Sequence, residues 1–216
     1  MTITEMHQSF RVFGQQMGMQ SIRAILPEEI DAFLNIAIDD KIKEVLANNY
    51  LNSRDNSLQG QISNNTLLTS LYKTKFVPQL SLDDNHYSSS IEDDDTIMYI
   101  TALGVNYAGI AKRFNCRIIS VDELYNTLND FCNKPSYDYP ICVIKKDDSN
   151  TRYLIDVYTD SKVPNSIDVV YIKYPNKVSL EDNIDCDLPE YSHNEIVQLA
   201  VQRYFNAVGS TTHNVE

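Results

Sequence analysis

The sequence predicts an α+β protein in which a helical bundle carries a β-rich insertion of antiparallel strands. Stretches near both chain ends repeat their apolar residues with helical spacing, whereas the part between residues 96 and 175 is rich in short β-prone runs. The expected helices are an N-terminal helix, a long helix over 27–49 and a C-terminal helix over 193–208. Helices from both ends of the chain therefore flank the predicted strands.

The stretch from residue 26 to 50 has the pattern of one long amphipathic helix. Its apolar residues recur at i, i+3, i+4 and i+7 and form one stripe: Ile30, Phe33, Leu34, Ala37, Ile38, Ile42, Val45 and Leu46. Pro27 suits the first helical turn, and Glu28 and Glu29 place negative charge at the positive end of the helix dipole. We expect this helix to be the spine of the bundle.

A shorter helix is expected before it, over residues 2–17. Thr2 and Glu5 have the spacing of a capping box, in which each side chain accepts a hydrogen bond from the other residue's N–H group. Apolar residues then follow at steps of three and four: Ile3, Met6, Phe10, Phe13 and Met17. This narrow seam is suited to pack on the long helix.

The part of the chain after the long helix is the least regular. The polar run 51–65 is expected to be a loop, 66–75 a short helix, and 77–91 a loop or weak strand. The acidic cluster 92–95 favours a solvated turn; a calcium site is the alternative, although the glycine and closing glutamate of an EF-hand are missing. Because long loops are usually functional, those around 51–65 and 77–95 are expected to face partners.

The middle of the chain is expected to form strands. Short apolar runs rich in β-branched and aromatic residues lie at 96–105, 116–119, 140–146, 152–159 and 167–175. The third and fourth runs are joined by the polar turn DDSN and predict a hairpin. A short helix over 122–131 is expected after the second run, with Ser120 or Asp122 as its cap.

The C-terminal helix has a marked start and stop. Ser192 and Glu195 have capping-box spacing, and Tyr191 is placed to pack on Ile196 as a hydrophobic staple. Gly209 is a natural stop, since helices commonly end at a glycine.

These elements predict one domain, 1–216, with a discontinuous organisation. The helical core is expected to comprise 1–76 and 186–209, and the β-rich insertion 92–178. The tail over 210–216 is expected to be flexible.

The charge of the chain argues against a nucleic acid or an anionic membrane as its main ligand. The 216 residues carry a net charge of −12 at pH 7, whereas both ligands bind cationic surfaces. No apolar run approaches the roughly 20 residues of a membrane span, and no signal peptide is visible. Fourteen tyrosines without a tryptophan suit half-buried sheets and subunit interfaces, or serve as ordinary strand and surface filler.

Neither the cysteines nor the histidines have the spacing of metal ligands or catalytic partners. The four cysteines are widely spaced and are expected to be free thiols in a reducing cytoplasm: Cys116, Cys132, Cys142 and Cys186. The sequence also has no phosphate-binding glycine loop and no G-x-S-x-G elbow. We therefore expect no catalytic residues, no cofactor and no metal, and a protein that is not an enzyme.

Two phrases and their order resemble one known family. The first opens the long helix as P-E-E-I-D-x-x-L-N-x-A, with Pro27, Glu28, Glu29, Ile30, Asp31, Leu34, Asn35 and Ala37. Before the second phrase, a strand ends in Y-I-x-x-P, with Tyr171, Ile172 and Pro175. The second phrase itself reads L-P-E-x-x-H-x-E-I-V-x-L-A, with Leu188, Pro189, Glu190, His193, Glu195, Ile196, Val197, Leu199 and Ala200. The chain thereby resembles the head–tail connector (adaptor or ring) proteins of short-tailed phages, especially those of the crAss-like type.

The resemblance implies a virion structural protein, made in the host cytoplasm and located at the portal vertex. Such proteins assemble as homo-oligomeric rings of about twelve copies below the portal, link the capsid to the tail and extend the channel for DNA. The implied partners are the portal protein and other tail or ring proteins, with DNA only as passing cargo and no membrane. The alternatives are another tail or muzzle component or, less favoured, a small phage-encoded enzyme or regulator.

A ring needs surfaces that meet a neighbouring copy. The residues expected at the oligomer or partner interface are Asp39, Lys43, Tyr87, Tyr171, Tyr174 and Arg203. The tyrosines offer contact area, and the long helix and the C-terminal helix are rigid elements on which such contacts are placed. An acidic chain also suits the wall of a DNA channel, because negative charge repels the phosphates.

Overall fold

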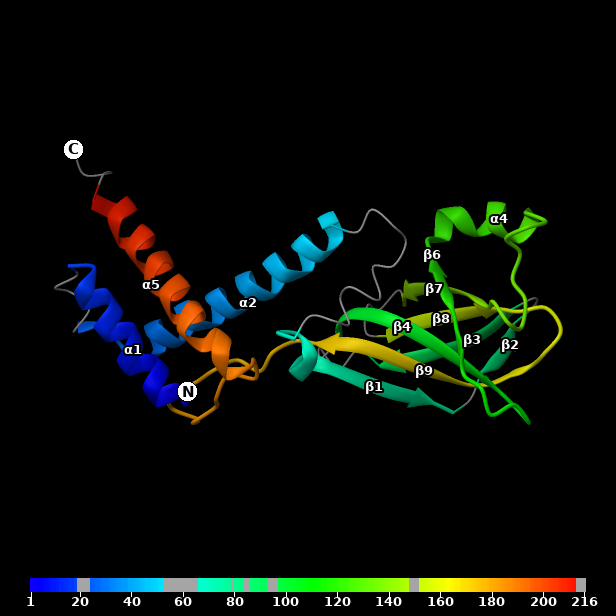
Figure 1. Ribbon diagram of the computed structural model, residues 1–216, viewed down its shortest axis with the longest axis horizontal. Coiled ribbons are helices and arrows are strands. Elements are labelled where there is room, and N and C mark those ends of the chain that lie inside the picture. The colour runs from blue at the N-terminus through cyan, green and yellow to red at the C-terminus, as the bar shows by residue number, and fades with distance from the viewer. Residues whose placement is uncertain are drawn as a thin grey trace. The chain divides into compact units, whose positions relative to one another are not determined.

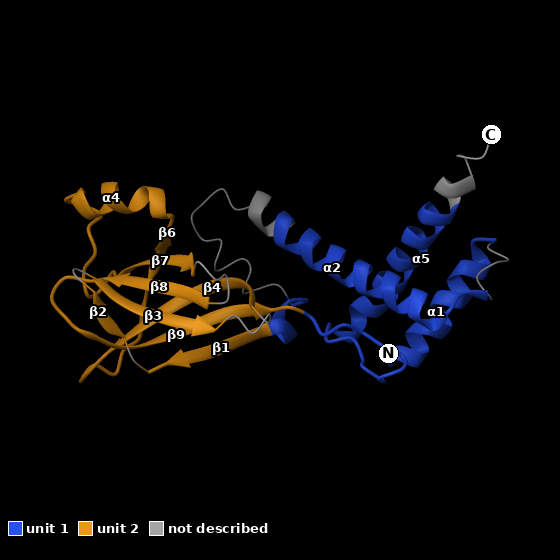
Figure 2. Cartoon of the chain, turned by 180° about the vertical axis from the view of Figure 1, so that it is seen from behind, with its two compact units in different colours: residues 1–71, 175–216 blue, residues 72–174 orange. Residues whose placement is uncertain are grey.

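The computed structural model describes residues 1–18, 24–52, 66–78, 80–83, 86–92, 97–147 and 152–212. These residues form helices and two β-sheets, which confirms the α+β class (Figure 1). The chain divides into two compact units, shown in different colours in Figure 2. Unit 1 comprises residues 1–71 and 175–216, and unit 2 comprises residues 72–174.

In the described part of unit 1 there are three α-helices, α1 (Ile3–Gln16), α2 (Pro27–Asn52) and α5 (Glu190–Thr212), and a short 3₁₀ helix η2 at Thr69–Leu71. The capping box at the start of α1 is confirmed, since the Thr2 hydroxyl accepts from the Glu5 N–H and the Glu5 carboxylate accepts from the Thr2 N–H at 2.9 Å. The long helix is confirmed as well, and it begins at Pro27 as predicted.

The core of unit 1 lies where the apolar faces of these helices meet. The α2 stripe is fully buried at Ile30, Leu34, Ala37, Ile38 and Ile42, each at most 1% exposed. The α5 face that contacts α1 and α2 buries Ile196, Val197, Ala200 and Val201. The Tyr204 ring of α5 packs edge-on against Phe10 of α1 and Phe33 of α2, which joins all three helices.

Two polar residues of α2 tie it to the segment that precedes α5. Asp31 accepts a hydrogen bond from the Leu180 N–H at 3.0 Å and lies 2.7 Å from the Nε2 atom of His7 in α1. The Asn35 amide donates to the Val178 carbonyl and accepts from the Val178 N–H. Because Val178 is only 2% exposed, Asn35 satisfies backbone groups that water does not reach.

The predicted start and stop of the C-terminal helix are wrong. Helix α5 begins at Glu190, so Ser192 lies inside its first turn, where the hydroxyl donates to the Pro189 carbonyl. Tyr191 is 63% exposed and forms no staple. The helix also continues through Gly209 to Thr212, so the part of the predicted flexible tail up to Thr212 is helical; residues 213–216 lie outside the described residues.

The described residues of unit 2 form nine strands in two sheets. The strands are β1 (Tyr72–Val77), β2 (Ser81–Asp83), β3 (His86–Glu92), β4 (Ile97–Tyr107), β5 (Phe114–Asn115), β6 (Arg117–Ile119), β7 (Ile141–Lys146), β8 (Arg152–Tyr158) and β9 (Pro164–Lys173). One sheet has the order β1-β9-β4-β5 and the other the order β2-β3-β8-β7-β6. The hairpin predicted from the third and fourth apolar runs is confirmed by the antiparallel pairing of β7 with β8.

The inner faces of both sheets contribute to one core. Residues that alternate along β4 and β9, such as Leu103, Val105, Ile167 and Val169, meet residues of the other sheet, and all four are fully buried. The partners in the second sheet include Cys142, Ile155 and Val157. Tyr171 lies on the same side of β9 as Val169, as the alternation predicted.

The strands begin earlier than the sequence predicts, and not all of them are antiparallel. The stretch 66–75, expected to be a helix, instead contains η2 and most of β1, because β1 pairs along its length with β9. The stretch 77–91, left between loop and weak strand, contains β2 and most of β3. Strands β6 and β7 pair in parallel. The loop expected at 51–65 is wrong for its first two residues, which belong to α2, and the turn expected at 92–95 is wrong for Glu92, which ends β3. The remaining residues of both, 53–65 and 93–95, lie outside the described residues.

The predicted short helix is confirmed as α4 (Val121–Asn129), with Ser120 at its N-cap position. Leu124 of α4 packs against a small outer cluster of unit 2, formed by Ile141, Val143, Tyr158 and Ile119. Helix α4 therefore lies on the outer face of the sheet that contains β7, away from the core between the sheets.

The expectation of four free thiols is wrong for two cysteines. Cys116 and Cys142 are joined by a disulfide in unit 2, with their Cα atoms 5.8 Å apart, whereas Cys132 and Cys186 are free. Burial raises the pKa of the Cys186 thiol. None of the described helices combines the length and apolar character that a bilayer span requires.

Candidate functional site

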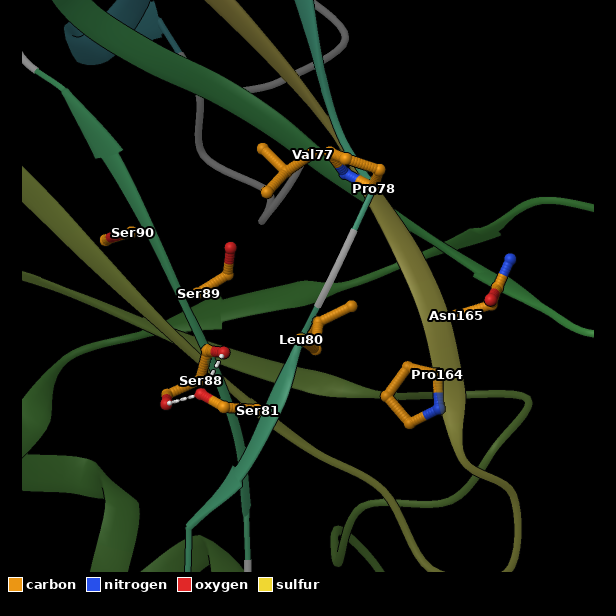
Figure 3. A pocket seen from close by; sticks show the side chains of 9 residues that line it. All are labelled: Val77, Pro78, Leu80, Ser81, Ser88, Ser89, Ser90, Pro164 and Asn165. Carbon is orange, nitrogen blue, oxygen red and sulfur yellow. Dashed lines mark hydrogen bonds between the residues drawn. The ribbon is translucent and has the colours of Figure 1, made fainter.

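A groove of about 720 Å³ opens in unit 2 where the edges of its two sheets separate (Figure 3). It is lined by the end of β1, by β2 and β3, and by the first residues of β9. β1 and β2 are the edge strands of their sheets and follow one another along the chain, which is why both sheets end at the same side. The lining residues are Val77, Pro78, Leu80, Ser81, Ser88, Ser89, Ser90, Pro164 and Asn165.

The chemistry of this groove is that of hydroxyl and amide groups beside small apolar side chains. The Ser81 hydroxyl donates to the Ser88 carbonyl at 3.1 Å and shares a hydrogen bond with the Ser88 hydroxyl at 3.0 Å (Figure 3). These neutral groups bind by hydrogen bonding and contact, without a charged group among the lining residues to move a proton.

A cluster of titratable groups lies on the outer face of the sheet that contains β3, β8 and β7. Asp156, only 6% exposed, accepts from the Lys145 ammonium at 2.7 Å, and its other oxygen lies 3.6 Å from the Nε2 atom of His86. The hydrogen bond to Asp156 raises the pKa of Lys145, and burial raises the pKa of Tyr158. The His86 ring stacks on the Tyr158 ring, with centroids 5.2 Å apart.

This cluster is arranged as an ion-pair network. His86 faces two carboxylates, since Asp83 also lies 3.8 Å from its Nε2 atom. Ser88 lies opposite Asp156 in the strand pairing, but its hydroxyl is bonded to Ser81. A nucleophile activated by a base needs a direct hydrogen bond between the two, and the ion pairs described for His86 are with the carboxylates of Asp83 and Asp156. Across the described residues, no group of three or more acidic, histidine or cysteine side chains is placed to hold a metal ion.

Five of the exposed apolar side chains of unit 2 lie on α4 and in the loop after it. Val121, Tyr125 and Leu128 are 52%, 77% and 37% exposed, and Phe131 and Tyr139 are 88% and 78% exposed. No residue of α4 is buried. Near this surface, a second hollow of about 500 Å³ is lined in part by Phe131, Tyr139, Arg117 and Lys134. An exposed apolar surface of this kind marks a site of protein contact.

Three of the residues predicted for an interface lie in unit 1. Asp39 and Lys43 are exposed one helical turn apart on α2. Arg203 of α5 already pairs within the chain, since its guanidinium lies 2.8 Å from the Asp40 carboxylate. Arg203 is thus paired with Asp40, and Asp39 and Lys43 are exposed elsewhere on α2.

The other three lie in unit 2. Tyr87 and Tyr171 pack from opposite sheets against the core between the sheets and are half-buried, which reduces the area they offer to a partner. Tyr174 is 50% exposed just after β9. Of these three tyrosines, Tyr87 and Tyr171 are therefore held by the core of unit 2, whereas Tyr174 is exposed.

Sequence reasoning missed both the serine-lined groove and the exposed side of α4. The groove arises from the pairing of strands far apart in the chain, which no local pattern indicates. The α4 signal was present in its apolar side chains, Val121, Leu124, Tyr125 and Leu128, but the sequence does not say which of them the sheet covers. Comparison with models of protein families and with curated proteins finds no match to this chain.

Proposed function

We propose that this chain is a virion structural protein that forms a ring between the portal and the tail of a short-tailed phage. The ring links capsid to tail and continues the channel through which DNA passes, and the chain itself carries out no catalysis. Its location is the portal vertex, and its partners are further copies of itself, the portal protein and the next tail component.

One observation carries the proposal. The two phrases that resemble connector proteins are distant in the sequence, yet both belong to unit 1, and the helices that they open, α2 and α5, contact one another. Their apolar positions are buried together, including Ile30 and Leu34 from the first phrase and Ile196 and Ala200 from the second. A resemblance by chance would not be expected to select residues that share one core.

The polar positions of the first phrase have structural roles as well. Asp31 and Asn35 bind backbone groups of Leu180 and Val178, in the segment that leads to the second phrase. This supports the finer description of the fold as a helical bundle with a β-rich insertion. In that description unit 1 is the part shared with connector proteins, and unit 2 is the part that adapts this chain to its partners.

The charge of the chain fits a DNA conduit. A net charge of −12 repels phosphates, so DNA passes along the wall without adhering to it. A ring structure whose lumen is lined by lysine and arginine side chains would contradict this part of the proposal.

The test is the mass of the purified chain, alone and with the portal protein encoded in the same genome, measured by native mass spectrometry and light scattering. The expected result is a ring of about twelve copies that binds the portal. A ring that binds only a distal tail protein would assign the chain to another tail or muzzle component. A monomer that binds neither would contradict the proposal.

A further inference from the structure

The hollow of about 500 Å³ beside the loop after α4 combines cations with aromatic rings. Arg117 and Lys134 line it together with Phe131 and Tyr139. Among its described lining residues there is no aspartate or glutamate. Because the chain has 30 acidic residues and a net charge of −12, a hollow whose only charged lining groups are cations stands apart from the rest of the molecule and suits an anion.

The guanidinium of Arg117 is held in place by the backbone around the hollow. Its Nη2 atom donates to the Asn133 carbonyl at 3.0 Å, and the Arg117 N–H donates to the Pro140 carbonyl at 2.9 Å. Strand β6 begins at Arg117 and pairs in parallel with β7. An arginine that is positioned before the ligand arrives loses less conformational freedom on binding, which favours affinity.

Asp130 orders the loop that carries Lys134. Its two carboxylate oxygens accept from the Asn133 amide at 2.5 Å and from the Cys132 N–H at 2.9 Å, and its carbonyl accepts from the Lys134 N–H at 3.0 Å. The hydrogen bonds from Asn133 and Cys132, together with the nearby charge of Arg117, lower the pKa of Asp130. Asp130 is therefore ionised at neutral pH.

The local charges match a ligand with one negative charge. Two cations, Arg117 and Lys134, and one carboxylate, Asp130, leave one positive charge to be balanced. The next carboxylate along the loop, Asp138, interacts with Tyr137 and does not line the hollow. A nucleic-acid strand is disfavoured, because it brings a phosphate with every nucleotide to a chain that carries a net charge of −12.

The aromatic rings add an apolar part to the same site. Phe131 is 88% exposed and Tyr139 is 78% exposed. The Nζ atom of Lys134 lies 5.8 Å from the centroid of the Phe131 ring, so a cation and a ring are presented side by side. A ligand that carries a ring or an aliphatic group next to its anion would contact both.

We propose that this hollow binds one carboxylate group carried next to an aromatic or aliphatic group. Arg117 and Lys134 donate to the carboxylate, and Phe131 and Tyr139 pack against the apolar part of the ligand. A free small acid has this chemistry, and so does an acidic residue beside an apolar one in a peptide segment. The site is a property of unit 2 and does not depend on the proposed ring.

Cys132 provides a reporter of occupancy, because it also lines the hollow and its thiol is free and exposed. In the full chain, 3-phenylpropionate is expected to slow alkylation of Cys132 by neutral iodoacetamide, measured by peptide mass spectrometry. The matched control is 3-phenylpropan-1-ol, which has nearly the same shape without the charge. It is expected to bind about tenfold more weakly, because it lacks the charge-assisted hydrogen bonds.

Two short peptides with blocked ends separate the two sources of the ligand. The sequence Gly-Asp-Phe-Gly carries the carboxylate beside a ring, and Gly-Asn-Phe-Gly is its neutral control. If the acidic peptide binds more tightly than 3-phenylpropionate, the ligand is a peptide segment; if 3-phenylpropionate binds more tightly, it is a free acid. Both results support the site.

Substitutions in the hollow assign the binding to its cations. Arg117→Gln and Lys134→Gln are each expected to weaken binding of 3-phenylpropionate about tenfold in a nuclear magnetic resonance titration. Lys112→Gln is the matched control, since Lys112 is an exposed lysine beside the Phe114 ring and does not line the hollow. Circular dichroism checks the fold, and Lys134→Gln keeps the test valid if the loss of the Arg117 contacts disturbs the loop.

The proposal is overturned if each acid protects Cys132 no better than its neutral control, or if Lys134→Gln binds 3-phenylpropionate as wild type does. Neither result bears on the proposed function, because the mass of the assembled chain is measured without these ligands. A monomeric chain that binds 3-phenylpropionate would, conversely, contradict the ring and support the site.

Discussion

Helices α2 and α4 are both amphipathic, but the structure treats their apolar rows in opposite ways. The α2 row is covered within unit 1, where Leu34 and Ile38 are at most 1% exposed. No residue of α4 is buried, and Tyr125 is 77% exposed. An amphipathic pattern indicates that a helix needs a partner surface, and unit 2 leaves most of the apolar side chains of α4 exposed.

The polar residues of α2 are bonded within the fold, whereas those at the start of α4 are exposed. On α2, Asp31 and Asn35 are engaged by backbone groups of a distant segment, which fixes the helix in the core of unit 1. On α4, Asp122 and Glu123 are exposed at the first turn, where they favour the helix dipole and remain available to a second molecule. We infer that α2 stabilises the fold and that α4 serves association.

The largest expected effect comes from matched leucine substitutions in the two helices. Leu34→Ala removes a side chain that is 0% exposed and is expected to lower the free energy of unfolding by about 2–5 kcal/mol, because it leaves a cavity. Leu128→Ala, at a position 37% exposed, is expected to cost less than about 1 kcal/mol in the dissociated chain. Urea unfolding followed by circular dichroism measures both, and equal losses would contradict the comparison.

An intermediate effect is expected from the polar residues. Asn35→Ala leaves the N–H and carbonyl groups of buried Val178 without their partner and is expected to cost about 1–3 kcal/mol. The control is Asn126→Ala on α4, an exposed position where the expected change is within about 0.5 kcal/mol. If Asn126→Ala proved as costly as Asn35→Ala in the same urea experiment, α4 would have to be packed as tightly as α2.

The smallest effect concerns Tyr72 at the start of β1, which is visible only at alkaline pH. Burial raises the pKa of Tyr72 from 10.0 to about 12, and its hydroxyl has no hydrogen-bond partner among the described residues. Between pH 10 and 12 the unfolded chain has lost this proton while the folded chain keeps it, so stability falls as pH rises through that window.

Tyr72→Phe is therefore expected to be nearly neutral at pH 7 and to remove part of the loss of stability between pH 10 and 12. Tyr174→Phe, at a position 50% exposed, is the matched control and should leave the pH profile unchanged. Thermal unfolding across this pH range gives the comparison; identical profiles for wild type and Tyr72→Phe would rule out the burial argument.

Sequence patterns correctly predicted those features of the fold that depend on interactions between residues close together in the chain. The capping box of Thr2 and Glu5 formed because both residues serve the same helix end. The identical spacing at Ser192 and Glu195 failed, because α5 begins two residues earlier and the Glu195 carboxylate binds Lys41 of α2 at 2.7 Å. A contact between distant residues thus replaced the local one.

Strand pairing explains the remaining differences. The run that contains Leu67, Leu68 and Leu71 has helical spacing, yet the chain extends at Tyr72 because β9 supplies a partner for all of β1. The pairing of β6 with β7 likewise brings Cys116 near Cys142, although 26 residues separate them in the sequence. Which side of α4 stays exposed also depends on the sheet beneath it, so the sequence predicted the helix but not the surface.

Hydroxyl-radical footprinting of the assembled and dissociated chain tests most directly whether a neighbouring copy covers α4. We expect Tyr125 and Phe131 to be oxidised readily in the dissociated chain and to become protected in the assembly, whereas buried Leu34 and Phe10 of unit 1 are protected in both states. Tyr125 and Phe131 that remain fully oxidised in an intact ring would contradict the account.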